Sequence, residues 1–533
     1  MTRQINSNAI LATSVFLLAW GLFCFLSVRE NTIGLLSDSY IYLLLADFFS
    51  PLHSLDKDFA AYLFSSYAYP PGFPILLGLL GGGSETTALN YVIDAAFLAG
   101  AIAAYFVWLL TQGLTRIQAG TLACVFMLLP GTLLSSLGIL SEHPYLLVTL
   151  VCASLMRSPF NSKNLLIAAL LIGCVALIRT VGVAAIFAFT IVCVLHYASK
   201  LISRRTCVLS LAFAISPFAL WSAFRKFFDF ESSYSDSIVS GDYLESFIGI
   251  VHQLPINLQA FWQHFKPLLT SFDSLGSVAC AMIISLMLIG WILALRKLRF
   301  DALYVLIYLC IIFAWPYPDH YGRFIFVILP LLLFYAFDGF RILLSLLMPK
   351  TRSETMNLVA GASYLLILVI LSTLGSLEII KDIYHQHGTA LHHIARTPDW
   401  HLLPSHNRAE KITALEKMLG SLQKVDQLTP STACVSSGEP HFVHFYARRR
   451  SSRPLPESAD ENSFERSLHH CPFVFMMAVA SIPPSEFPAM YPFHRIEQEM
   501  LVLDVSFFEG DTKQGTVSTM LAATGVAKKT IGR

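Results

Sequence analysis

The sequence predicts an all-α polytopic membrane protein with about eleven transmembrane helices and a small α/β extramembrane domain at its C-terminal end. Of the 533 residues, 55% are hydrophobic and only 13% are charged, whereas a soluble domain carries about 25% charged residues. Apolar runs recur along the chain until residue 378 and stop there. A formal net charge of +1 excludes nucleic-acid binding through bulk basicity.

The spans are predicted from apolar runs of membrane length. The first follows a single arginine and resembles a signal peptide, but without a clear small-residue cleavage site we expect it to be retained. Four of the runs are short, so the number of spans stays open by one helical hairpin, that is, by two spans. The runs lie near 9–28, 87–110, 118–137, 143–157, 164–178, 181–198, 206–224, 275–295, 302–315, 323–345 and 356–378.

Basic residues predict the orientation, because Lys and Arg concentrate in cytoplasmic loops. One side of this scheme holds Arg3, Arg116, Arg157, Lys163, Lys200, Arg204, Arg205, Arg296, Lys297, Arg299, Lys350 and Arg352. The opposite loops, 29–86 and 225–273, are richer in acidic residues. We therefore expect a cytoplasmic N-terminus, an outer first loop and, after an odd number of spans, an extracytoplasmic C-terminal domain.

The chain is expected to divide into a transmembrane module, 1–380, and an extramembrane domain, 381–533, where charged residues, His and Pro become common. Residues 406–424 predict an amphipathic helix, and a polar tail is expected after Gly510. Short buried strands are expected at 433–435, 473–480 and 500–507. Whether Cys434 and Cys471 pair stays open, because it depends on an oxidising compartment.

The first outer loop contains an acidic residue where an apolar helix begins. In the segment 37–42 (SDSYIY), Asp38 precedes Tyr40 and Tyr42. The helix dipole favours a carboxylate at a helix N-terminus, but Ser-Asp pairs are also common caps. Both roles, functional carboxylate and helix cap, stay open from this motif alone.

A proline-rich motif follows in the same loop, at residues 69–74 (YPPGFP), and begins with Tyr69. The prolines oppose a helix through the motif. The apolar run up to Leu80 is too short to span the membrane, so we expect a segment that lies in the interface or enters and returns. A rigid turn is the alternative.

The fourth span begins with Ser141, Glu142 and His143 on the outer side. A carboxylate at the edge of the hydrocarbon is costly unless it lines a wet cavity, which makes Glu142 a functional candidate beside the simpler interpretation as a helix cap. Asp94, within the second span, either faces the same cavity or bonds a neighbour on its own helix.

Two arginines occupy outer turns. Arg179 lies between two short spans, and Arg323 follows Asp319 and His320 ahead of the tenth span. An interfacial arginine often only extends its head to the headgroups. Two of them beside outer carboxylates also suit a phosphate-bearing lipid, because guanidinium binds phosphate bidentately.

We predict no metal and no cofactor. The pair of carboxylates in 56–58 (DKD) matches a two-carboxylate metal pattern, but so short a motif is more often an exposed pair. The histidine pairs 392–393 and 469–470 lack further ligands at a convincing spacing. Phosphate-binding glycine loops, nucleophile elbows and haem motifs are absent from the sequence.

Taken in order, these motifs resemble the GT-C class of membrane glycosyltransferases over about residues 1–345. More narrowly, the chain resembles the bacterial branch related to dolichyl-phosphate-mannose–protein mannosyltransferases (glycosyltransferase family 39-like) and to aminoarabinose transferases. The resemblance rests on Asp38 with its aromatic neighbours, the 69–74 motif, Ser141-Glu142, Arg179 with a glycine three residues on, and 321–324 (YGRF). In the C-terminal part, 445–449 (FYARR) is similar to a Tyr-Thr-Gly-Arg stretch of several relatives.

The resemblance implies an inverting transfer of a sugar from a polyprenyl-phosphate donor to an acceptor hydroxyl on the outer face of a bacterial inner membrane. Asp38 would be the general base, a role that contributes roughly 10²–10⁴-fold. Arg323 and Arg179 would stabilise the donor phosphate, and Glu142 would orient acceptor or sugar as the second catalytic carboxylate. The predicted substrate-binding residues are Tyr40, Tyr42, Tyr69, His143, Asp319 and His320.

The expected partners are the lipid-linked sugar donor, the bilayer, and an acceptor whose type (glycolipid, polysaccharide or protein) stays open. A second acidic residue, frequent beside the base in some relatives, is Ser39 here. This difference is a further reason to predict no metal.

Three other functions fit a polytopic chain. A transporter or flippase of lipid-linked glycans does not need a long acidic first loop, and the broken helices in matching halves that transporters tend to show are not evident. An O-antigen polymerase or ligase, which uses diphosphate-linked oligosaccharides, usually has its large outer loop late in the chain. An inert membrane scaffold is the third.

Overall fold

The structure is a computed structural model, and it divides into two compact units, each described by itself below. Unit 1 comprises Met1–Asn31, Phe64–Leu76 and Ala88–His385; unit 2 comprises Thr32–Leu63, Leu77–Thr87 and Gln386–Arg533. The described residues are 2–28, 37–55, 57–67, 69–157, 162–228, 243–270, 274–315 and 321–347, most of 361–381, and then 434–437, 440–446, 452–454, 473–479, 501–507 and 517–523.

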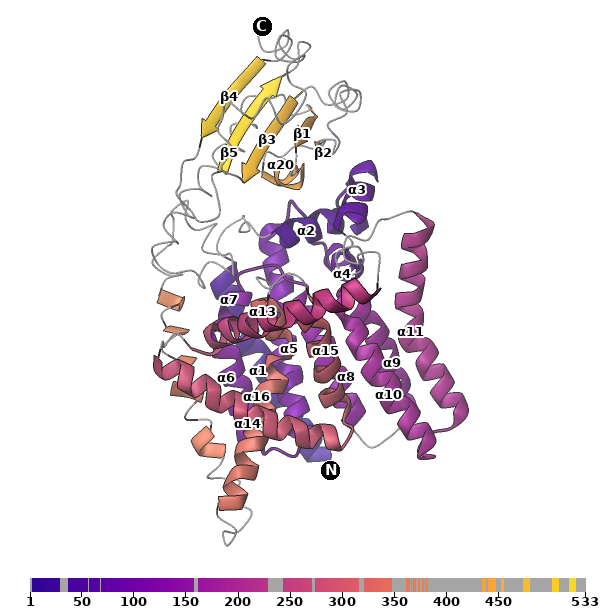
Figure 1. Cartoon of the computed structure of the whole chain (residues 1–533), viewed down its shortest axis with the longest axis vertical. Coiled ribbons are helices and arrows are strands. Elements are labelled where there is room, and N and C mark those ends of the chain that lie inside the picture. The colour runs from indigo at the N-terminus through magenta and orange to yellow at the C-terminus, as the bar shows by residue number, and fades with distance from the viewer. Residues whose placement is uncertain are drawn as a thin grey trace. The chain divides into compact units, whose positions relative to one another are not determined.

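Unit 1 is a bundle of membrane-length helices, which confirms the predicted polytopic helical fold (Figure 1). Among the described residues, six helical segments are long and apolar enough to cross a membrane. They are α1 (Thr2–Ser27), α5 (Thr87–Thr111), η1 (Thr180–Gly182) with α10 (Val183–Ala198), α11 (Arg204–Phe227), α14 (Ser274–Arg296) and α16 (Tyr321–Leu347). Shorter helices in the same unit are α6 (Arg116–Leu128), α8 (Glu142–Arg157), α9 (Ser162–Ile178) and α15 (Phe300–Phe313).

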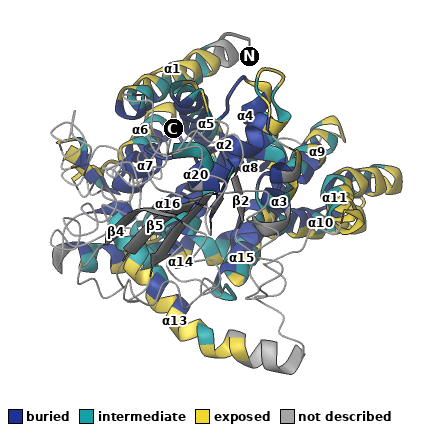
Figure 2. Ribbon diagram, turned by 90° about the horizontal axis from the view of Figure 1, so that it is seen from above, coloured by how far each residue is buried: buried dark blue, intermediate teal, exposed yellow. Residues whose placement is uncertain are grey.

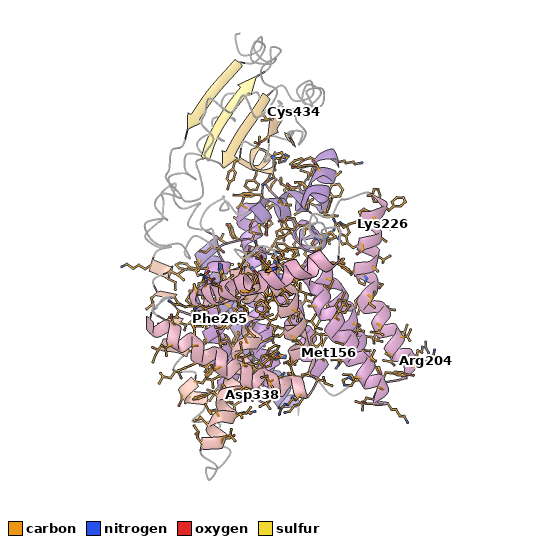
Figure 3. The ribbon with its side chains drawn as sticks, in the orientation of Figure 1. Met156, Arg204, Lys226, Phe265, Asp338 and Cys434 are labelled. Carbon is orange, nitrogen blue, oxygen red and sulfur yellow. The ribbon has the colours of Figure 1, made fainter. Side chains whose placement is uncertain are left out.

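The spanning helices differ in how much of their surface the protein itself covers. In the most apolar 18-residue stretch of each helix, the protein itself buries 61% of the stretch in α5 and 67% in α16. The same share is only 17% in α1 and in α11. Figure 2 shows the difference as dark blue α5 against yellow along α11. Arg204 and Lys226 stand at opposite ends of α11, with the apolar stretch between them (Figure 3). The uncovered apolar faces of α1 and α11 are therefore the surface that lipid contacts.

Two predicted segments differ from their expected structure. The span expected at 118–137 is interrupted, because α6 ends at Leu128 and Pro130 begins the short helix α7 (Pro130–Ser135), a position where proline's missing N–H costs nothing. The acidic loop 225–273 contains α13 (Tyr243–Leu269), a long helix that we did not expect. The Asn257 side chain ties α13 to the end of α15 by donating to the carbonyls of Phe313 (2.8 Å) and Trp315 (2.9 Å).

The proline-rich motif also differs from expectation, because helix α4 (Gly72–Leu79) begins inside it. Pro74 lies in the first turn of α4, where a proline removes no intrahelical hydrogen bond. A Cβ on Gly72 would lie within 3.0 Å of the Leu177 carbonyl, so the motif packs directly on the backbone of α9. This close approach requires glycine at position 72.

Helices α14 and α16 approach each other through two glycines. A Cβ on Gly290 would lie less than 3.0 Å from the carbonyl oxygen of Tyr335, and a Cβ on Gly339 less than 3.0 Å from that of Leu286. Small residues permit such backbone contact between membrane helices.

We therefore expect Gly290→Ala to destabilise the protein by about 1–3 kcal/mol, the usual cost of overpacking. Thermal unfolding of the detergent-solubilised protein measures the effect. Gly21→Ala on α1 is the matched control, because a Cβ there meets nothing within 4 Å; alanine at that position should be neutral or stabilising. Equal unfolding temperatures for the two variants would contradict the close contact.

Unit 2 contains a five-stranded sheet of order β2-β1-β3-β5-β4, which confirms the predicted small α/β domain. Strand β1 pairs in parallel with β2 and β3, and β5 pairs antiparallel with β3 and β4. The strands are β1 (Val435–Ser437), β2 (Ser452–Pro454), β3 (Phe473–Val479), β4 (Leu501–Phe507) and β5 (Val517–Ala523), with helix α20 (Pro440–Tyr446) following β1.

The end of the chain corrects one prediction. The segment after Gly510 was expected to be a polar tail, but β5 lies there, between β3 and β4 in the sheet. Its sequence (VSTMLAA) is only weakly apolar, and its pairing with two neighbouring strands supplies the stability that the pattern does not reveal. The helix expected at 406–424 lies outside the described residues.

Cys434, just before β1, is disulfide-bonded, and it is the one such residue in the described part of the chain. Cys471, the partner that the sequence suggests, lies outside the described residues. The eight cysteines outside the C-terminal part are free thiols.

Candidate active site

The site in unit 1 is built around Glu142, the first residue of α8, whose side chain is fully buried. Both predicted arginines bind the same carboxylate oxygen. The Arg179 Nη1 lies 2.6 Å from Glu142 Oε1, and the Arg323 Nε lies 2.7 Å from it. Arg179 follows α9 in an extended conformation, and Arg323 lies in the first turn of α16. Three segments distant in sequence therefore meet at one buried carboxylate.

The surroundings of the cluster restrain Arg179 in particular. Its Nη1 also donates to the Ser141 hydroxyl at 3.1 Å, and its guanidinium lies 6.0 Å from the centre of the Phe324 ring. The Tyr308 hydroxyl donates to the Phe324 carbonyl at 3.0 Å, which holds the start of α16 against α15. The arginine is held by a charge, a hydroxyl and an aromatic ring at once.

The cluster of Glu142, Arg179 and Arg323 has an excess of positive charge. Two guanidinium groups and one carboxylate sum to 2 − 1 = +1. Each guanidinium has five N–H donors in a planar fork that matches carboxylate and phosphate oxygens. Buried charges are stable when they are paired, so an anion is the ligand that this arrangement favours.

A second buried pair lies beside the cluster and joins α5 to α8. The His143 Nδ1 is 2.7 Å from the Asp94 Oδ2, and both side chains are almost completely buried. The His143 ring lies edge-on to Phe326 on α16, with 6.0 Å between centroids. Asp94 therefore pairs across helices with the residue next to Glu142. The other ring nitrogen of His143 has no hydrogen-bond partner within the described residues.

The opposite end of unit 1 holds a different polar network. Arg299 binds both carboxylate oxygens of Asp301 at 3.1 and 2.6 Å, and it also reaches Gln112 at 2.6 Å. The Tyr335 hydroxyl donates to Asp301 as well. From Asp94 to Gln112, the residue directly after α5, the chain rises about 27 Å. The Glu142 cluster and this network therefore lie near opposite ends of α5.

In unit 2, Asp38 lies in the first turn of α2 (Ser37–Phe49) and is partly exposed. Tyr40 and Tyr42 of the same helix are buried. At the other end of α2, Asp47 accepts hydrogen bonds from the backbone N–H and the hydroxyl of Ser84. Burial raises the pKa of Asp47 to about 6. The hydrogen bonds join α2 to the turn after α4.

Of the residues predicted for the site, the structure brings Glu142, Arg179 and Arg323 into contact and places His143 beside them. Tyr69 is partly buried. The predicted substrate contacts of Tyr40, Tyr42, Tyr69 and His143 stay predictions, and Asp319 and His320 lie outside the described residues. Phe324 belongs to the 321–324 motif, but its contact with Arg179 was not predicted. Tyr308 was not predicted either, because a tyrosine within an apolar run has the pattern of an ordinary core residue.

No protein-family model matches the sequence, and no curated protein matches it. The chain is similar to the solved structure of the Archaeoglobus fulgidus oligosaccharyltransferase complex with Zn and sulfate, at 14% identity and a TM-score of 0.47, over 94% of this chain and 72% of that one. It is also similar to ArnT from Cupriavidus metallidurans bound to undecaprenyl phosphate, at 13% identity and a TM-score of 0.46, over 96% and 97% of the two chains.

Proposed function

We propose that the protein is an inverting glycosyltransferase of the GT-C class, similar to the glycosyltransferase family 39 branch. It would move a sugar from a polyprenyl-phosphate donor to an acceptor hydroxyl on the outer face of the membrane. The observation that supports this most directly is the contact of Arg179 and Arg323 with buried Glu142 near one end of a membrane bundle. A lipid-linked phosphate is the anion that both the charge and the location favour.

The arginines have a defined part in the proposed chemistry. As the bond between the anomeric carbon and the phosphate oxygen breaks, negative charge grows on the phosphate that leaves. Guanidinium donors aimed at that charge stabilise the transition state more than the ground state. Glu142 orients both guanidinium groups, and Ser141 with Phe324 restrains one of them.

The acceptor side of the reaction is assigned to Asp38 as general base. An acceptor hydroxyl attacks the anomeric carbon from the face opposite the phosphate, and Asp38 takes its proton as the new bond forms. This assignment follows from the family resemblance and from the position of Asp38 in the first turn of α2. No step of the proposal passes through a metal or a cofactor.

The proposed location is the bacterial inner membrane, with the N-terminus in the cytoplasm and residues 381–533 outside. The basic residues at the predicted cytoplasmic ends and the disulfide-bonded Cys434 support this orientation. The acceptor would meet the donor at the outer boundary, where polyprenyl-linked sugars present their headgroups.

A transfer assay with the purified protein in liposomes tests the proposal. The donor is a labelled sugar on a polyprenyl monophosphate, and the acceptors offered are membrane glycolipid, polysaccharide and protein fractions. We expect label in one acceptor fraction with an inverted anomeric centre. We also expect undecaprenyl phosphate, but not undecaprenol, to raise the unfolding temperature.

Two outcomes would overturn this function. Flipping of the labelled lipid without transfer would support a flippase. Transfer only from a diphosphate-linked donor would support a polymerase or ligase.

A further inference from the structure

The C-terminal domain contacts the helix that carries Asp38. Within unit 2, the hydroxyl groups of Tyr40 on α2 and Tyr446 on α20 are 2.5 Å apart, a hydrogen bond that joins residues 406 positions apart in sequence. The two rings meet edge to face with 5.4 Å between centroids, and Phe445 packs on Tyr40 in the same manner at 5.1 Å. Tyr40 is fully buried by these contacts and its other neighbours.

Helix α20 is itself anchored to the sheet. It packs on β1 and β2, and the side chains of Val435 in β1 and Val443 in α20 are completely buried. Cys434, directly before β1, is disulfide-bonded. The tyrosine that reaches Tyr40 therefore extends from a helix fixed to a cross-linked sheet domain.

A second contact holds the neighbouring helix α3 (Lys57–Tyr67) to the same element. The rings of Phe59 on α3 and His444 on α20 are stacked, with 4.9 Å between centroids and 15° between planes. Burial lowers the pKa of His441, on the same helix, to about 4, so that imidazole is neutral at physiological pH. The surface of α20 toward α2 and α3 is thus lined by aromatic rings.

We infer that Tyr446 is a positioning residue for Asp38, acting through Tyr40, so that the C-terminal domain takes part in setting the geometry of the reaction. The inference rests on the function proposed above. Asp38 lies two residues before Tyr40, in the first turn of α2, where a helix otherwise frays. Fixing Tyr40 fixes the backbone of this turn. Displacement of a reacting group by about 1 Å costs on the order of 10²-fold in rate.

The test compares Tyr446→Phe, which removes only the hydroxyl, with Tyr446→Ala, which removes the ring as well. We expect kcat to fall about fivefold for the first, as for one lost hydrogen bond, and roughly 10²-fold for the second. KM for the donor should stay unchanged, because neither change alters a residue of the arginine cluster. Tyr197→Phe on α10, where the tyrosine is 45% exposed, is the control for loss of a tyrosine hydroxyl and should keep full kcat.

A readout independent of activity completes the test. Carbodiimide labelling of Asp38, followed by mass spectrometry, reports how firmly the first turn of α2 is held. We expect Tyr446→Ala to speed this labelling several-fold while labelling of Glu85, an exposed carboxylate of the same unit, stays constant.

The outcomes separate the two hypotheses. If Asp38→Asn abolishes transfer while both Tyr446 variants keep full kcat and unchanged Asp38 labelling, this inference is wrong and the proposed function stands. If Asp38→Asn transfers sugar at the normal rate, the assigned base is wrong, whatever the labelling shows. Faster labelling of Glu85 together with Asp38 would indicate general unfolding of unit 2 and would also overturn the positioning role.

Discussion

Asp38→Asn is expected to lower the transfer rate by roughly 10²–10⁴-fold, the contribution of a general base, while the protein folds normally. Asparagine has the same shape as aspartate but cannot accept the proton of the attacking hydroxyl. The measurement is single-turnover transfer from a labelled polyprenyl-phosphate sugar, with thermal unfolding recorded for the same preparation.

Comparison with Asp38→Ala decides between the base and the helix cap. Asparagine caps a helix as well as aspartate does, whereas alanine loses the cap at a cost of about 1 kcal/mol. A base predicts that both variants are inactive; a cap predicts that the asparagine variant is active and only the alanine variant is destabilised. Glu85→Gln, a change of an exposed carboxylate in the same unit, should leave transfer unaltered.

Glu142→Gln is expected to destabilise the protein by about 3–5 kcal/mol, because it leaves Arg179 and Arg323 side by side without their shared counter-charge. The formal charge of the three groups rises from 2 − 1 = +1 to +2. Thermal unfolding in detergent measures the loss. Transfer should fall with it, because the two guanidinium groups still bind an anion but are no longer aligned by their shared carboxylate.

A double variant tests whether the loss of stability in Glu142→Gln comes from the unbalanced charge. Adding Arg323→Gln to Glu142→Gln returns the sum of the three groups to +1, and we expect the double variant to unfold at a higher temperature than Glu142→Gln alone. Undecaprenyl phosphate should raise the unfolding temperature of Glu142→Gln more than that of the parent, because the added anion replaces the missing carboxylate. A double variant less stable than the single one would contradict the charge argument.

Much of the fold follows from local pattern. Each apolar run must form its backbone hydrogen bonds internally once it is in lipid, so α1, α5, α11, α14 and α16 lie close to the predicted bounds. The hydrophobic pattern did not predict elements whose sequences mix apolar residues with prolines or polar residues. Helix α13 contains Pro255 and Pro267, and β5 (VSTMLAA) lacks the apolar–polar alternation of a half-buried strand, so neither resembles a standard element.

The sequence by itself determined that this protein spans the membrane several times, that a polar domain follows the spans, and that a few charged residues stand at span ends. Those conclusions need only composition and periodicity, which are properties of neighbours along the chain. Tertiary structure alone decided which side chains meet. It brings Glu142 to Arg179 and Arg323, Asp94 to His143, and Tyr446 to Tyr40. Such contacts join residues up to 406 positions apart, and they depend on how helices and strands pack, which no local pattern encodes.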